Sequence, residues 1–92
     1  MTMTRQEFLT CSGVQVQTLD FWLEQRWLIP EQTAAGTNFS DVDVARARLI
    51  LDLKADLGVN DEGVEVVLHL VDQLHGLRRA LEQLKDLEAN SR

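Results

Sequence analysis

Hydrophobic positions recur at helical spacing along most of the chain, and short polar segments separate the helices that they predict. Thr4 followed by Glu7 is the pattern of a capping box, which satisfies backbone amides at a helix start. A first short helix is therefore expected from here to Gly13, which can take the positive φ of a helix end. A second helix is predicted over residues 16–25, with its apolar positions on one face: Leu19, Trp22 and Leu23. Two short helices joined by a glycine-containing turn make a helix-turn-helix.

A polar segment separates the second helix from the third. Pro30 cannot continue a helix, and residues 31–38 are small and polar. Residues 28–29 before this segment and residues 38–39 after it are predicted to pair as a minimal β-hairpin. Such a hairpin is the wing of a winged helix-turn-helix.

The third helix begins with a second capping pattern, Ser40 with Asp43, and ends at Gly58. Its apolar positions predict a buried stripe: Val42, Ala45, Leu49, Ile50, Leu53 and Leu57. Its charged positions are expected on the solvent side: Asp43, Arg46, Asp52 and Asp56.

The last helix is expected to be long, roughly 28 residues or about 42 Å at the standard rise. From its middle onward the apolar positions alternate spacings of four and three: Leu70, Leu74, Leu77, Leu81 and Leu84. A helix presents such a seam to a partner helix. The first half of the helix has an alternative, packing on the chain's own domain. The second half extends beyond a domain whose radius of gyration should be about 12 Å, so we expect a homodimer.

Composition indicates one small helical domain. The chain has 92 residues, of which 45% are hydrophobic and 26% charged, with one proline and no tyrosine. The predicted fold is all-α: a winged helix-turn-helix with a minimal β-hairpin wing and a long C-terminal helix. We assign residues 1–92 to a single domain, with the winged helix-turn-helix at 1–58 and the C-terminal helix at 59–89.

The charge balance argues against DNA as the partner. Fifteen acidic side chains face nine basic ones, for a net charge of −6. Binding to a duplex depends on clustered cations that displace counterions from phosphates. An acidic surface suits a basic protein partner, or serves solubility alone.

No constellation of residues in the sequence points to catalysis. There is no glycine-rich phosphate loop, no nucleophile motif, and no pair of Cys or His residues at metal-ligand spacing. We therefore expect no enzyme activity, no metal and no cofactor. Cys11 is the single cysteine, and no apolar run approaches the length of a membrane span. These features favour a soluble protein of the cytoplasm.

Residues 13–30 resemble the recognition segment of MerR-type winged helix-turn-helix proteins. The family pattern there is roughly Gly-Val-x-x-x-Thr-Leu-Arg-aromatic-aromatic-Glu, then Gly-Leu-Leu and Pro. The resemblance continues at residues 39–41 and 57–59, so it covers nearly the whole chain. The chain departs from the pattern at Asp20, where the family places an arginine against the phosphates, and at Asn38, where the family's wing carries an arginine. A carboxylate held against a phosphate repels it.

An acidic, dimer-forming member of this fold is similar to the chaperone-modulator family CbpM. Shared features are the length, the N-terminal helix-turn-helix, the paired arginines Arg46 and Arg48, and the leucine-rich charged C-terminal helix. The resemblance implies binding to the J-domain of a DnaJ-like co-chaperone, CbpA, and inhibition of its activity with DnaK. The alternatives are a small MerR-type DNA-binding transcriptional regulator and a dimerisation module for another partner.

Four residues are candidates for the partner-binding surface. Asp20 and Glu24 lie four apart on one helix face, where they can attract a basic helix, and their alternative role is a solvated face. Trp22 and Trp27 are candidate anchors, and their alternative role is core packing.

Overall fold

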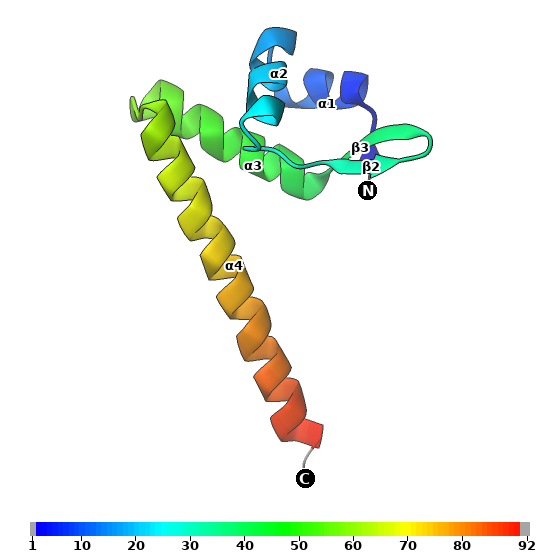
Figure 1. Ribbon diagram of the computed structural model, residues 1–92, viewed down its shortest axis with the longest axis vertical. Coiled ribbons are helices and arrows are strands. Elements are labelled where there is room, and N and C mark those ends of the chain that lie inside the picture. The colour runs from blue at the N-terminus through cyan, green and yellow to red at the C-terminus, as the bar shows by residue number, and fades with distance from the viewer. Residues whose placement is uncertain (1, 91–92) are drawn as a thin grey trace. The chain divides into compact units, whose positions relative to one another are not determined.

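The computed structural model describes residues 2–90. Its elements, in chain order, are β1 (Thr2–Met3), α1 (Arg5–Ser12), α2 (Val16–Glu24), β2 (Glu31–Thr33), β3 (Gly36–Ser40), α3 (Asp41–Leu51), η1 (Asp52–Asp56) and α4 (Asp61–Asn90). The chain divides into two compact units, Met1–Asn60 and Asp61–Arg92. The first unit is the winged helix-turn-helix and the second is α4 (Figure 1). The predicted fold class is confirmed.

The capping box at the start of α1 is formed as predicted. The Glu7 backbone N–H donates to the Thr4 hydroxyl at 3.2 Å, and the Thr4 N–H donates to the Glu7 carboxylate at 3.0 Å. The bonds from Thr4 hold the pKa of Glu7 below its ordinary value of 4.5, because they favour the ionised carboxylate. The helix ends at Gly13, whose φ of 73° lies in the left-handed region.

The wing is a hairpin of β2 and β3, but it is not the hairpin that the sequence predicted. The strand after α2 begins at Glu31, and residues 28–29 are not part of it. The reason is packing, because the Leu28 side chain lies in the core, and Pro30 has no N–H to donate to a strand. The register joins Glu31 to Asn38, Gln32 to Thr37 and Thr33 to Gly36.

A third strand, which the sequence analysis missed, completes the sheet. β1 pairs antiparallel with β3, with Met3 opposite Phe39, so the strand order is β1-β3-β2. Figure 1 shows α1 and α2 on one side of α3, with the hairpin projecting beyond them next to the N-terminal strand. The ring of Phe39 stacks on Phe8 of α1, with centroids 4.4 Å apart, which fixes the sheet to the helices.

α3 begins with the predicted capping box. The Asp43 carboxylate accepts from the Ser40 N–H at 2.9 Å, and the Asp43 N–H donates to the Ser40 hydroxyl at 3.4 Å. These bonds draw Asp43 into a buried position, where its carboxylate is satisfied. Its predicted place on the solvent side is therefore wrong.

The predicted buried stripe of the third helix is only partly right. Ile50 and Leu53 are buried, but Val42 is 72% and Leu57 70% exposed. Ala47, which the prediction omitted, is fully buried. Leu57 leaves the buried stripe because a π-helical turn, Asp52–Asp56, precedes it and alters the number of residues per turn. Ala45 is also exposed, and the chain leaves the helix at Gly58 with φ 65°.

α4 is one continuous helix of 30 residues, close to the predicted length (Figure 1). Val64 and Leu68 in its first half are buried, whereas every residue from Leu77 to the end of the helix is exposed. In the described part of the chain, no helix combines the length and apolarity that crossing a membrane requires.

Candidate functional site

The outer face of α2 carries carboxylates. Asp20 and Glu24 lie one helical turn apart and both are exposed, as predicted from their spacing. The sequence of α2 contains no lysine and no arginine. The buried side of the helix is formed by Leu19 and Trp22, and its exposed residues include the two carboxylates together with the apolar Val16 and Phe21.

A guanidinium from α1 reduces the charge of this face. The Arg5 side chain donates to the Asp20 carboxylate at 2.5 Å, and both side chains are about half exposed. The two residues are fifteen positions apart, so no local pattern predicts the pair. Glu24, one turn further along, therefore carries more of the uncompensated negative charge of this face.

The wing, like α2, contains no lysine or arginine. Residues 31–40, which form β2, the turn and β3, include Glu31 and no lysine or arginine. Glu31 is exposed, and Asn38 is half-buried. Taken together, α2 and the wing carry three carboxylates, those of Asp20, Glu24 and Glu31, and no basic side chain.

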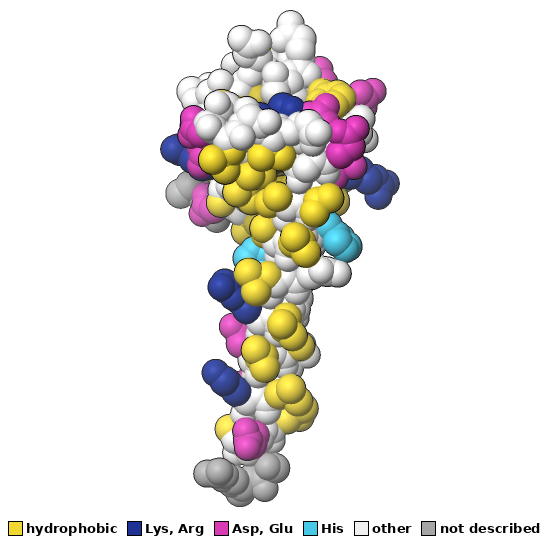
Figure 2. Space-filling model, turned by 90° about the vertical axis from the view of Figure 1, so that its left-hand side faces the viewer, with side chains coloured by type: hydrophobic (Ala, Val, Ile, Leu, Met, Phe, Trp, Pro, Cys, Tyr) yellow, Lys and Arg dark blue, Asp and Glu magenta, His cyan; other side chains and the backbone are white. Residues whose placement is uncertain are grey.

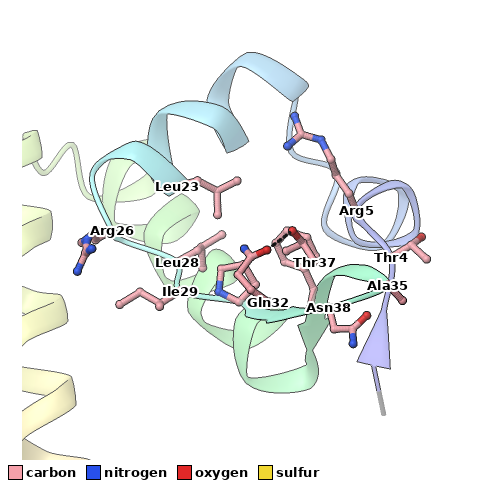
Figure 3. A pocket seen from close by; sticks show the side chains of 12 residues that line it. Thr4, Arg5, Leu23, Arg26, Leu28, Ile29, Gln32, Ala35, Thr37 and Asn38 are labelled. Carbon is pink, nitrogen blue, oxygen red and sulfur yellow. Dashed lines mark hydrogen bonds between the residues drawn. The ribbon is translucent and has the colours of Figure 1, made fainter.

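A groove lies between the end of α2 and the wing, with a volume of about 710 Å³. We call it the helix–wing groove. It is lined by Thr4, Arg5, Leu23, Arg26, Leu28, Ile29, Pro30, Gln32, Ala35, Thr37, Asn38 and Phe39. Figure 3 shows Leu23 and Leu28 together between α2 and the hairpin, with Gln32 accepting a hydrogen bond from the Thr37 hydroxyl at 3.0 Å. The sequence analysis did not find this groove, because its lining combines the start of α1 with residues 23–39, which the fold brings together.

The arginines of the first unit do not form one basic strip. Arg26 lines the helix–wing groove, whereas Arg48 lines a separate cavity of about 230 Å³ beside Cys11. Arg46 is partly buried, and its Nε donates to the backbone carbonyl of Trp27. These three arginines therefore lie in different parts of the first unit, and Arg46 holds a backbone carbonyl of the fold.

A family model described as a MerR HTH family regulatory protein matches residues 3–86. The chain belongs to the MerR helix-turn-helix family. The match covers the winged helix-turn-helix and most of α4. No curated protein and no solved structure matches the chain.

Within this MerR-family fold, α2 occupies the position of the recognition helix identified in the sequence. Its exposed face has Asp20 where the family pattern has arginine, and the structure pairs that carboxylate with Arg5. The winged helix-turn-helix is thus complete, but α2 and the wing carry no lysine or arginine.

The two candidate tryptophan anchors lie in the core of the first unit. Trp22 and Trp27 are each 2% exposed, in agreement with the core-packing alternative. A partner cannot reach either side chain in this conformation. The exposed apolar residues nearest to them in sequence are Phe21, whose ring meets Trp27 edge-on at 5.6 Å, and Ile29.

The predicted leucine seam of α4 is exposed. Its five members are between 47% and 61% accessible: Leu70, Leu74, Leu77, Leu81 and Leu84. Figure 2 shows hydrophobic side chains following one another along α4, with basic side chains beside them. The five leucines therefore form an exposed apolar stripe along α4.

No group of three or more His, Cys, Asp or Glu side chains among residues 2–90 is placed to hold a metal ion. Cys11 is an exposed free thiol.

Proposed function

We propose that this MerR-family protein is a chaperone modulator that binds the J-domain of a DnaJ-like co-chaperone, CbpA, in the cytoplasm and inhibits its activity with DnaK. One observation carries the proposal: α2 and the wing, the two elements that a winged helix-turn-helix applies to DNA, hold three carboxylates and no lysine or arginine. The choice of a DnaJ-like co-chaperone as the partner rests on the resemblance to the CbpM family.

The charges of these elements oppose DNA binding. Each cation that contacts a phosphate contributes to affinity by releasing counterions, and a winged helix-turn-helix obtains most of its sequence-independent affinity in this way. Asp20 and Glu24 would instead face the phosphates. The Arg5 guanidinium is engaged by Asp20, and Arg46 holds a backbone carbonyl.

The same face suits a basic helix of a protein. A J-domain presents such a helix to DnaK, so a chain that covers it competes with DnaK. Exposed charges at the rim of an interface mainly speed and orient the encounter, while apolar contacts supply affinity. Glu24 and Asp20 are the rim charges in this proposal, and Phe21 and Ile29 replace the buried tryptophans as exposed apolar contacts.

Calorimetry with the full-length DnaJ-like co-chaperone and mobility-shift assays with duplex DNA test the proposal. We expect saturable binding to the co-chaperone, reduced stimulation of the DnaK ATPase, and no shift of DNA at low salt. The double variant Asp20→Arg, Asn38→Arg restores the two cations of the family pattern and serves as the positive control for DNA. Tight and steeply salt-dependent DNA binding by the wild-type chain would refute the proposal.

A small MerR-type DNA-binding regulator is the second candidate. The observation in its favour is the family match itself, because the matched model describes regulatory proteins and the winged helix-turn-helix is complete. The mobility-shift assay above decides between the two functions.

We further propose that the chain is a homodimer joined through the leucine seam of α4. The seam alternates spacings of four and three, which matches the side chains of a second helix in a coiled coil. Covering it removes from water the leucine side chains that α4 leaves exposed.

A further inference from the structure

The helix–wing groove differs in charge from the outer face of α2. Its charged lining residues are Arg5 and Arg26, and none of its twelve lining residues is Asp or Glu. The chain as a whole carries a net charge of −6, so this is a locally cationic groove in an acidic protein. Arg5 is paired with Asp20. Arg26, in contrast, forms no ion pair or hydrogen bond with any side chain among residues 2–90.

The backbone of Arg26 is held in an unfavourable conformation. Its φ is 62°, and no other non-glycine residue among residues 2–90 has a positive φ. In this region the Cβ atom of an L-residue crowds the following carbonyl oxygen, which is why glycine is preferred. The residue follows α2 directly, where the chain must turn back toward Trp27, and glycine would serve the turn better. Such a backbone outlier with an exposed side chain supports the hypothesis that the side chain binds a partner group.

The floor of the groove is apolar. Leu28 is fully buried, and the half-buried Leu23 meets it between α2 and the hairpin (Figure 3). Ile29 is 71% exposed, and Figure 3 shows its side chain extending toward the same end of the groove as Arg26. The groove therefore offers apolar surface and an unpaired guanidinium side by side.

We propose that the helix–wing groove receives a segment of the protein partner that carries an aliphatic side chain next to a carboxylate, with the carboxylate on Arg26 and the aliphatic group against Ile29 and Leu23. The guanidinium fork matches a carboxylate geometrically, and the apolar floor has no counterpart on a phosphate backbone. A nucleic acid is therefore the poorer occupant. The inference rests on the proposed function, because the partner is the same co-chaperone, and it adds a second contact of opposite charge to the acidic face of α2.

Isothermal titration of the full-length DnaJ-like co-chaperone into Arg26→Gly and Ile29→Ser tests the inference. Arg26→Gly removes the guanidinium and relieves the backbone, so a loss of binding cannot come from unfolding, and thermal melts of the same sample check this. We expect each variant to weaken binding about fivefold to tenfold, and Arg26→Lys to recover only part of the loss.

Two matched controls separate the groove from general effects. Arg79→Gln removes one cation from exposed surface of α4, and Val42→Ser makes the same kind of change as Ile29→Ser at a residue of equal exposure outside the groove. Both controls should bind like the wild type. Equal binding by wild type, Arg26→Gly and Ile29→Ser would overturn the inference while leaving the proposed function intact.

Two other outcomes identify different failures. A wild-type chain that does not bind the co-chaperone would refute the proposed function and this inference with it. If the wild type binds duplex DNA and Arg26→Gly abolishes that binding, the groove contacts DNA phosphates. This outcome also overturns the inference.

Discussion

The Arg5 guanidinium of α1 donates to the Asp20 carboxylate of α2 at 2.5 Å, joining the two helices of the helix-turn-helix across their exposed edge. In the MerR pattern the position of Asp20 is an arginine. The carboxylate that stands at this position forms an internal ion pair with Arg5. Because both side chains are about half exposed, the pair adds little stability, and its main effect is on the charge of the surface.

Reversing the charge of the α2 face should weaken co-chaperone binding. We expect the double variant Asp20→Lys, Glu24→Lys to bind about tenfold more weakly, because like charges then oppose the partner's basic helix. The free energy of unfolding should fall by only about 0.5 kcal/mol with the loss of an exposed ion pair. Calorimetry and urea titration measure the two quantities. Glu82→Lys with Asp86→Lys places the same change at the same spacing on α4, and an equal loss there would assign the effect to net charge.

Arg26→Gly should stabilise the first unit. Glycine tolerates a φ of 62° without the Cβ contact, and the gain exceeds its greater chain entropy in the unfolded state. We expect the free energy of unfolding to rise by about 0.5–1 kcal/mol in urea titration. Gln25→Gly, one residue earlier at φ −77°, should destabilise, and a gain at both positions would contradict the assignment of strain to Arg26.

Gly76→Ala should strengthen α4. Glycine inside a helix costs about 1 kcal/mol relative to alanine, and a Cβ at Gly76 meets no atom within 4 Å. The free energy of unfolding should rise by about that amount. The same substitution at Gly58, where φ is 65°, should lower it. A loss of stability at Gly76 would reveal a close approach by another chain on that side of the helix.

A polar residue in the leucine seam should dissociate the proposed dimer. Leu74→Gln and Leu81→Gln each place an amide in the apolar interface, and sedimentation equilibrium should then give a lower apparent mass. Arg79→Gln introduces the same side chain outside the seam and should leave the mass unchanged. A wild-type chain that already sediments as a monomer would refute the dimer.

The capping box of α1 should make stability depend on pH. The bonds from Thr4 place the pKa of Glu7 below 4.5, so the unfolded chain takes up this proton at a higher pH than the folded chain does. The stabilisation is therefore complete above 4.5 and is lost as the pH falls through the folded pKa. Thermal melts should show the difference between wild type and Glu7→Gln shrinking over that window. A difference that stays constant with pH would contradict this role of Glu7.

Features set by a few neighbouring residues were predictable from the sequence. Both capping boxes, Thr4 with Glu7 and Ser40 with Asp43, form as their spacing indicates. The exposure of Asp20 and Glu24 followed from the helical period of α2. Local patterns of this kind need no tertiary information.

Features that depend on packing were not predictable in the same way. The stripe of α3 was wrong at Val42 and Leu57, because a capping bond buries Asp43 and a π-helical turn shifts the later residues. The strand β1 has only two residues and no period of its own. The groove beside Arg26 depends on how α2, the chain after it and the wing meet, which no single segment specifies.

The second half of α4 has no core of its own, since every residue from Leu77 to Asn90 is exposed. A lone helix of about that length is marginal in water. In the dimer proposed above, a second α4 covers these leucines, so assembly and folding of this segment are one equilibrium. We then expect the helix content of this segment to rise with protein concentration and to fall on dilution.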